Sequence, residues 1–151
     1  MEYTFETTHR NRKLLHDLFE KLSIDQLNQI PEGFKNNIIW NIAHVIVTQQ
    51  LLAYGLSNLP RNVSEEMIAA YRNGTKPEKD LSENEMNSIK GMLFNTNEQI
   101  KIDYDAGRFE EYKTYTTSTG HTLSNVEEAL EYNNYHEGLH MGTIRAYLNL
   151  V

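Results

Sequence analysis

The sequence predicts an all-α protein that folds as a four-helix bundle. Four long segments carry apolar residues at a spacing of three to four, as in amphipathic helices. The three prolines (Pro31, Pro60 and Pro77) all fall where this periodicity lapses. The connections between the segments are short to medium in length, which suits helices packed side by side. At 151 residues, the chain is expected to form a single domain over residues 1–151.

The first predicted helix spans about residues 4–22. Its apolar residues are spaced so that one face turns toward a core. They are Phe5, Leu14, Leu15, Leu18, Phe19 and Leu22. The connection over residues 23–37 is expected to contain one helical turn around residues 25–30.

The second predicted helix, about residues 37–56, has no wide polar face. A helix that is apolar nearly all round is expected to be buried on more than one side. Its longest apolar stretch, Ile38 to Ala53, is interrupted by polar residues and is too short to span a bilayer. The polar connection that follows is predicted to contain a short helix from Glu65 to Tyr71.

The third and fourth helices are each predicted to begin at a capping box. In this motif a serine and a glutamate three residues later satisfy each other's backbone N–H groups. Ser82 and Glu85 mark the start of a helix to about residue 104, and Ser124 and Glu127 mark the start of the last helix. The last helix is expected to continue to the chain end. Residues 105–121 are predicted to be extended or to form a small hairpin.

Composition excludes several classes of function. The net charge of −7, from 14 basic and 21 acidic residues, disfavours a nucleic-acid partner. The absence of cysteine excludes disulfides, cysteine zinc sites and a thiol nucleophile. The N-terminus has neither a basic n-region nor an apolar h-region, so no signal peptide is predicted. A cytoplasmic protein with no membrane partner is expected.

The last helix carries the H-E-x-x-H pattern of zinc peptidases, from His136 to His140. Histidines four residues apart lie on one helix face, and this face is also the apolar, inward one. Zincins need a third ligand downstream, but the eleven residues after His140 include no Asp, Glu or His. A peptidase is therefore rejected. Glu137 lies about 100° around the helix from His136, which favours a packing or helix-contact role, while a role supporting the site or as a base stays open.

A third histidine, His44, lies in the middle of the apolar second helix. The three histidines are either hydrogen-bonded core residues or metal ligands. A metal would offset the cost of burying unpaired polar groups, and neutral imidazole binds zinc and nickel well. Three ligands would leave a coordination position open, which favours catalysis or ligand binding. Asn41 shares the face of His44 and is a candidate partner of the site, with a helix–helix hydrogen bond as the alternative; His121 is a candidate for its mouth.

Two stretches of the sequence resemble motifs of a known family. Asn37-Ile38-Ile39-Trp40-Asn41-Ile42-Ala43-His44 resembles the "nsi-W-x-x-x-H" element of the DinB-like (YfiT-like) superfamily, and residues 136–144 resemble its "H-x-x-x-H-x-G-x-I" element. The similarity extends over most of the chain, including residues 118–123. It implies a four-helix bundle with up-down-down-up topology, often dimeric, and a divalent metal ion, nickel or zinc, on His44, His136 and His140.

The resemblance also implies a class of function. Characterised relatives include thiol S-transferases that use bacillithiol, mycothiol or glutathione, and a maleylpyruvate isomerase. We therefore expect a metal-dependent thiol S-transferase or hydrolase that forms a homodimer and acts on a small molecule such as a low-molecular-weight thiol. The lack of cysteine is compatible with this, because the cosubstrate would bring the thiol. The alternative is a metal-binding or stress-linked interaction module without catalytic activity.

Overall fold

The computed structural model describes all residues 1–151, and most of them are helical. The elements in chain order are α1 (Glu2–His16), α2 (Leu18–Lys21), α3 (Ile24–Asn28), α4 (Ile38–Gln50), the π-helical η1 (Leu51–Gly55), α5 (Glu65–Tyr71), α6 (Glu83–Asp105), β1 (Tyr115–Thr116), β2 (Thr122–Leu123) and α7 (Val126–Tyr147). The predicted all-α class is confirmed. No helix of the chain combines the length and the apolar character that a membrane span requires.

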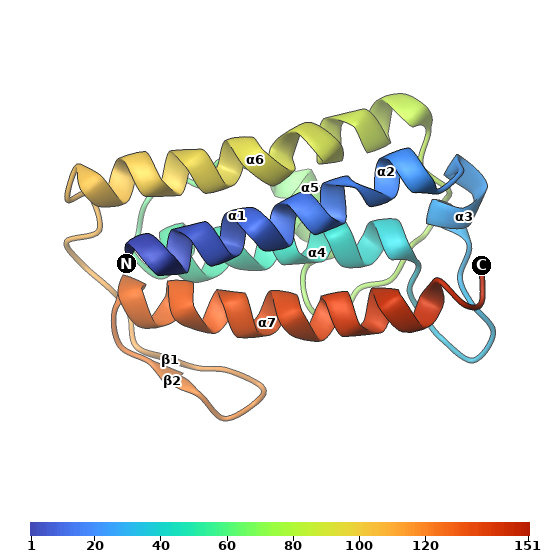
Figure 1. The fold of residues 1–151 in the computed structure, drawn as a ribbon. Coiled ribbons are helices and arrows are strands. Elements are labelled where there is room, and N and C mark those ends of the chain that lie inside the picture. Colours follow the sequence, from blue (N-terminus) through green and yellow to red (C-terminus); the bar gives the residue numbers. More distant parts are fainter.

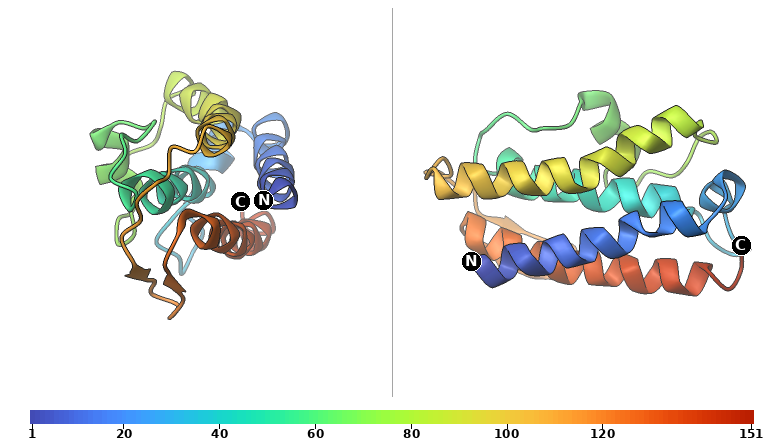
Figure 2. Two further views of the ribbon diagram at one scale, coloured as in Figure 1. Left: turned by 90° about the vertical axis from the view of Figure 1, so that its left-hand side faces the viewer. Right: turned by 45° about the horizontal axis from the view of Figure 1, so that its top comes forward.

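The four long helices, α1, α4, α6 and α7, lie side by side around a common core (Figures 1 and 2). Helices α1 and α4 each contact both α6 and α7. Each long helix therefore has two long neighbours, and α1 lies diagonally opposite α4. The short α5 packs on α4 from outside this group.

Helix α4 is the most deeply buried element, as its apolar sequence predicted. Every residue of α4 except Thr48 is buried. The reason is its position, because α3, α5, α6 and α7 all contact it. The predicted helix over residues 37–56 is α-helical only to Gln50 and then continues as the π-helical turn η1. The first predicted helix, over residues 4–22, is likewise interrupted, at Asp17.

The capping box at Ser82 and Glu85 is confirmed, with both of its hydrogen bonds present. The box predicted at the start of the last helix is wrong by one residue. Asn125 is the N-cap of α7, and its side chain accepts a hydrogen bond from the backbone N–H of Glu128 at 2.8 Å. The Glu128 carboxylate in turn accepts from the backbone N–H of Ser124. Asparagine caps helices as well as serine does, so the pattern alone did not separate the two registers.

A small hairpin is present as the antiparallel pair β1–β2, with Tyr115 opposite Leu123. Its second strand begins at Thr122, just beyond the predicted residues 105–121. Gly120 has a φ of 85° in its turn, a left-handed conformation that glycine adopts without steric cost. The buried Leu123 packs in one apolar cluster with Tyr132 of α7. The hairpin therefore lies along the N-terminal half of α7 (Figure 1).

Candidate metal centre

The three predicted histidines meet between α4 and α7. His44 comes from α4, and His136 and His140 come from α7. One ring nitrogen from each lies within 4.8 Å of the others, so the group could hold a metal ion. The ring centroids are 5.2 Å apart for His44 and His136, 4.7 Å for His44 and His140, and 4.6 Å for His136 and His140. The convergence is possible because α4 and α7 are direct neighbours.

His44 is held in one orientation and one tautomer. Its Nδ1 lies 2.7 Å from the backbone oxygen of Tyr71. A carbonyl oxygen can only accept, so Nδ1 carries the proton, and Nε2 has an unprotonated lone pair that accepts from the Thr48 hydroxyl. The ring also stacks on Trp40, with centroids 4.7 Å apart and planes 9° from parallel. Nε2 lies 3.3 Å from the hydroxyl of Thr48. His44 thus presents Nε2 as its ligand atom.

His140 is oriented by Asn41, which lies on the opposite helix. Its Nδ1 is 2.8 Å from Asn41 Oδ1. The amide of Asn41 is itself fixed, because its Nδ2 donates to the backbone oxygen of Asn37 at 2.8 Å. His140 therefore donates from Nδ1 and has a free Nε2. The predicted alternative for Asn41, a hydrogen bond between helices, is confirmed, and this bond joins α4 to a candidate ligand on α7.

His136 differs from the other two. Its Nδ1 is buried and has no hydrogen-bond partner. A buried ring nitrogen without a partner costs free energy that a bound ion or an ordered water would offset. A donor set of neutral imidazoles without cysteine or carboxylate suits zinc and nickel. The three side chains therefore fit a divalent transition-metal ion.

Burial lowers the pKa of all three imidazoles. The pKa of His44 is below its ordinary value, mainly because the ring is desolvated, although the hydrogen bond to Tyr71 opposes the shift. Burial, followed by the nearby His44 and Arg12, lowers the pKa of His136 to about 4. Burial, followed by His136 and His44, lowers the pKa of His140 to about 3. All three rings are therefore neutral at pH 7, as metal binding requires.

These shifts predict how the stability of the metal-free protein depends on pH. The folded-state pKa values of His136 and His140 lie below the ordinary value of 6.5. Between these values the unfolded chain binds more protons than the folded chain, so stability falls as the pH falls below about 6.5. Each histidine contributes a slope of at most about 1.4 kcal/mol per pH unit. Urea unfolding with chelator present, between about pH 7 and about pH 5, measures it. If a His136→Asn/His140→Asn variant lost stability with falling pH as steeply as the wild type, these two histidines would not be the cause of the pH dependence.

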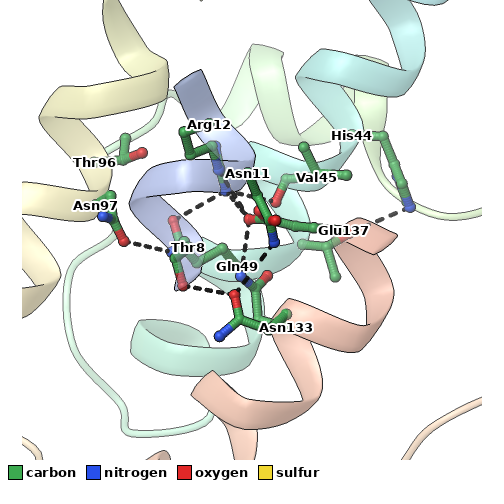
Figure 3. A network of polar contacts seen from close by, with 12 residues as sticks. Thr8, Asn11, Arg12, His44, Val45, Gln49, Thr96, Asn97, Asn133 and Glu137 are labelled. Carbon is green, nitrogen blue, oxygen red and sulfur yellow. Dashed lines mark hydrogen bonds and ion pairs between the residues drawn. The ribbon is translucent and has the colours of Figure 1, made fainter. Parts of the chain in front are cut away.

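Glu137 forms a buried ion pair that confirms the predicted helix-contact role (Figure 3). Neither Glu137 nor its partner, Arg12 of α1, has any exposed side-chain surface. Glu137 Oε1 lies 2.7 Å from Arg12 Nη2 in the ion pair. It accepts hydrogen bonds from Arg12 Nε and from Asn133 Nδ2, both at 2.9 Å. A carboxylate held in this way is not the free base of a peptidase.

The sequence interpretation missed Arg12, although a signal was present. The buried residues of α1 are Phe5, Thr8, Arg12 and Leu15. Their spacing of three or four places Arg12 on the inward face despite its charge. The prediction instead put Leu14 on that face, and Leu14 is 57% exposed.

The other histidines lie outside the ligand group. The rings of His9 and His16 contact Phe94, at centroid distances of 5.4 and 5.2 Å. His121, in the hairpin turn, packs 5.2 Å from the ring of Tyr132. Tyr132 in turn lies 6.3 Å from the ring of His136. One aromatic side chain therefore separates His121 from the candidate centre.

A surface cavity of about 950 Å³ lies on the α5 side of α4. It is bounded by α4, α5 and the segment that follows α5, and its walls include Trp40 and Tyr71. None of the three histidines lines it. We place the candidate centre at the histidines, because only there do metal-binding side chains converge.

Comparison with known proteins identifies the family of the chain. No curated protein matches the chain. The family model described as the DinB superfamily matches residues 7–144, a range that covers most of the chain and contains His44, His136 and His140. The chain therefore belongs to the DinB superfamily.

Proposed function

We propose that His44, His136 and His140 hold a divalent metal ion, nickel or zinc, and that the protein is a metal-dependent enzyme. Thiol S-transfer or hydrolysis on a small-molecule substrate is the proposed chemistry. The observation that carries the proposal is the convergence, within 4.8 Å, of one imidazole nitrogen each from the buried His44 and the half-buried His136 and His140. Membership of the DinB superfamily supports it.

A bound metal ion with an open coordination position would lower the pKa of a thiol or water placed there and polarise a substrate. The protein's own groups prepare the ligands for this. The backbone oxygen of Tyr71 and the amide of Asn41 orient two imidazoles, and burial keeps all three neutral. Thr48, the one residue of α4 that is not buried, places its hydroxyl beside His44 Nε2 and is suited to bind an incoming group.

No cysteine is present, so a thiol for transfer would come from a second substrate. A low-molecular-weight thiol such as bacillithiol, mycothiol or glutathione fits this requirement. The chain would then supply the ligands and the binding surface, and the cosubstrate would supply the nucleophile.

The proposal extends to the arrangement of the chain. It takes the four long helices to have up-down-down-up topology. In support, α1 and α7 begin at the end of the bundle that bears the N label in Figure 1, and α4 and α6 begin at the other. It takes residues 1–151 as one domain, in line with the family match over residues 7–144. A homodimer and a cytoplasmic location are expected from the resemblance and the sequence, and sedimentation analysis would test the dimer.

Metal analysis and thiol-transfer assays test the function together. Untagged protein is expected to retain about one equivalent of zinc or nickel by mass spectrometry. Transfer of a thiol to an electrophile should disappear with a chelator and return when the metal is restored. A metal content that is the same in His44→Ala, His136→Ala and His140→Ala would exclude this site. Full metal occupancy without turnover on any of the thiols would favour the metal-binding interaction module.

A further inference from the structure

We propose that Arg12 and Glu137 are positioning residues for the metal centre. Their buried ion pair sets how α7 lies against α4, and thereby brings His44, His136 and His140 together as one ligand set. This inference rests on the proposed function, because it concerns the same site.

The first support is that one guanidinium contacts two helices that carry the histidines. Arg12 Nη2 lies 2.7 Å from Glu137 Oε1 on α7. The same nitrogen donates to the backbone oxygen of Val45 and to Gln49 Oε1 on α4, both at 3.3 Å. Figure 3 shows these residues of α4 and α7 gathered around Arg12.

The second support is where these contacts fall in the sequence. Val45 directly follows His44, and Glu137 directly follows His136. A shift of α7 by one residue moves its side chains by about 1.5 Å along the axis and about 100° around it. Such a shift would break the contact with Glu137 and would also separate His136 from His44. The ion pair and the ligand set therefore depend on the same register.

The third support is that this pair is a costly way to stabilise a core. Both side chains are completely buried, and removing two charges from water can cost more than their attraction returns. The network is also incomplete, since Arg12 Nη1, Asn133 Oδ1 and Glu137 Oε2 have no partners. Apolar residues would fill the space as well, but directional hydrogen bonds add a preference for one register. Metal ligands need such specification, because their geometry must hold within about 0.5 Å.

The test replaces both charges, so that neither is left buried alone. An Arg12→Met/Glu137→Leu variant replaces the two charged side chains with apolar side chains of similar length. Tyr54→Phe is the matched control, because it removes another buried hydrogen bond, from Tyr54 to Asp103 at 2.6 Å, without touching the histidines or the ion pair. Zinc affinity is measured by competition with a chelator, and ligand geometry by the absorption spectrum of the cobalt-loaded protein, both well below the unfolding temperature.

Zinc is expected to bind the double variant about 10- to 100-fold more weakly than the wild type, with an altered cobalt spectrum. Tyr54→Phe is expected to match the wild type in both. Arg12→Lys keeps the charge but not the planar fork that reaches two helices, so it should weaken zinc binding by about tenfold. Arg12→Lys takes the place of the double variant in the test if the double variant does not fold.

The possible outcomes distinguish a failure of the positioning role from a failure of the proposed metal-dependent function. Wild-type affinity and spectrum in the folded double variant, or in Arg12→Lys if the double variant is unfolded, overturn the positioning role and leave the metal site standing. A wild-type chain that binds none of zinc, nickel and cobalt overturns the proposed function, and the positioning role with it.

Discussion

Glu137→Ala is expected to lower the free energy of unfolding by about 3–5 kcal/mol. The substitution leaves the Arg12 guanidinium buried without its carboxylate, and it removes the acceptor of Asn133. A buried charge that loses its partner is far more costly than the pair itself was worth. Urea unfolding of the metal-free proteins measures the change, provided that the dependence of the unfolding free energy on urea concentration is the same in both proteins.

Two variants control for this effect. Glu131→Ala makes the same substitution at an exposed position of α7 and should change the unfolding free energy by less than about 0.5 kcal/mol. Arg12→Met/Glu137→Leu should recover most of the loss, because no isolated charge remains. Equal effects of Glu137→Ala and Glu131→Ala would mean that the protein in solution does not contain the buried ion pair.

His140→Ala is expected to weaken zinc binding by about 3 kcal/mol, or roughly a hundredfold. Four-ligand structural zinc sites bind with about 10–16 kcal/mol, so one ligand carries about a quarter of that. The substitution also removes the His140 N–H that donates a hydrogen bond to the amide oxygen of Asn41. Chelator competition measures the affinity, and the rise in melting temperature on adding zinc provides a second readout.

His9→Ala is the matched control for this prediction. His9 is exposed, and its ring contacts Phe94 rather than the ligand group. The His9→Ala protein should bind zinc as tightly as the wild type does. A His140→Ala protein with wild-type affinity and the full melting-temperature rise would place the bound ion elsewhere on the chain.

The secondary structure followed closely from the residues. The short helix α5 has the predicted bounds, Glu65–Tyr71, and the Ser82 capping box starts α6. These features depend on hydrogen bonds and apolar spacing within a few residues of one another. The break at Asp17 and the π-helical turn after Gln50 were not predicted, because apolar spacing does not distinguish an α-helix from a brief departure from it.

The candidate site was partly predictable, because part of its signal also lies within a few residues of the chain. His136 and His140 share a face because they are one turn apart, and His44 stands out as a polar residue in an apolar helix. Arg12 carried only a weak signal, its spacing from Phe5 and Leu15. Its partner, Glu137, is 125 residues away, and no local pattern connects the two.

The sequence by itself therefore determined which residues could bind a metal and which helix faces carry them, since helical periodicity is a local property of the chain. Only the tertiary structure decided how those residues are held. The carbonyl of Tyr71 selects the tautomer of His44, Asn41 selects that of His140, and Arg12 finds its carboxylate on α7. Each of these partners belongs to another element, and only the packing of the helices brings them within hydrogen-bonding distance.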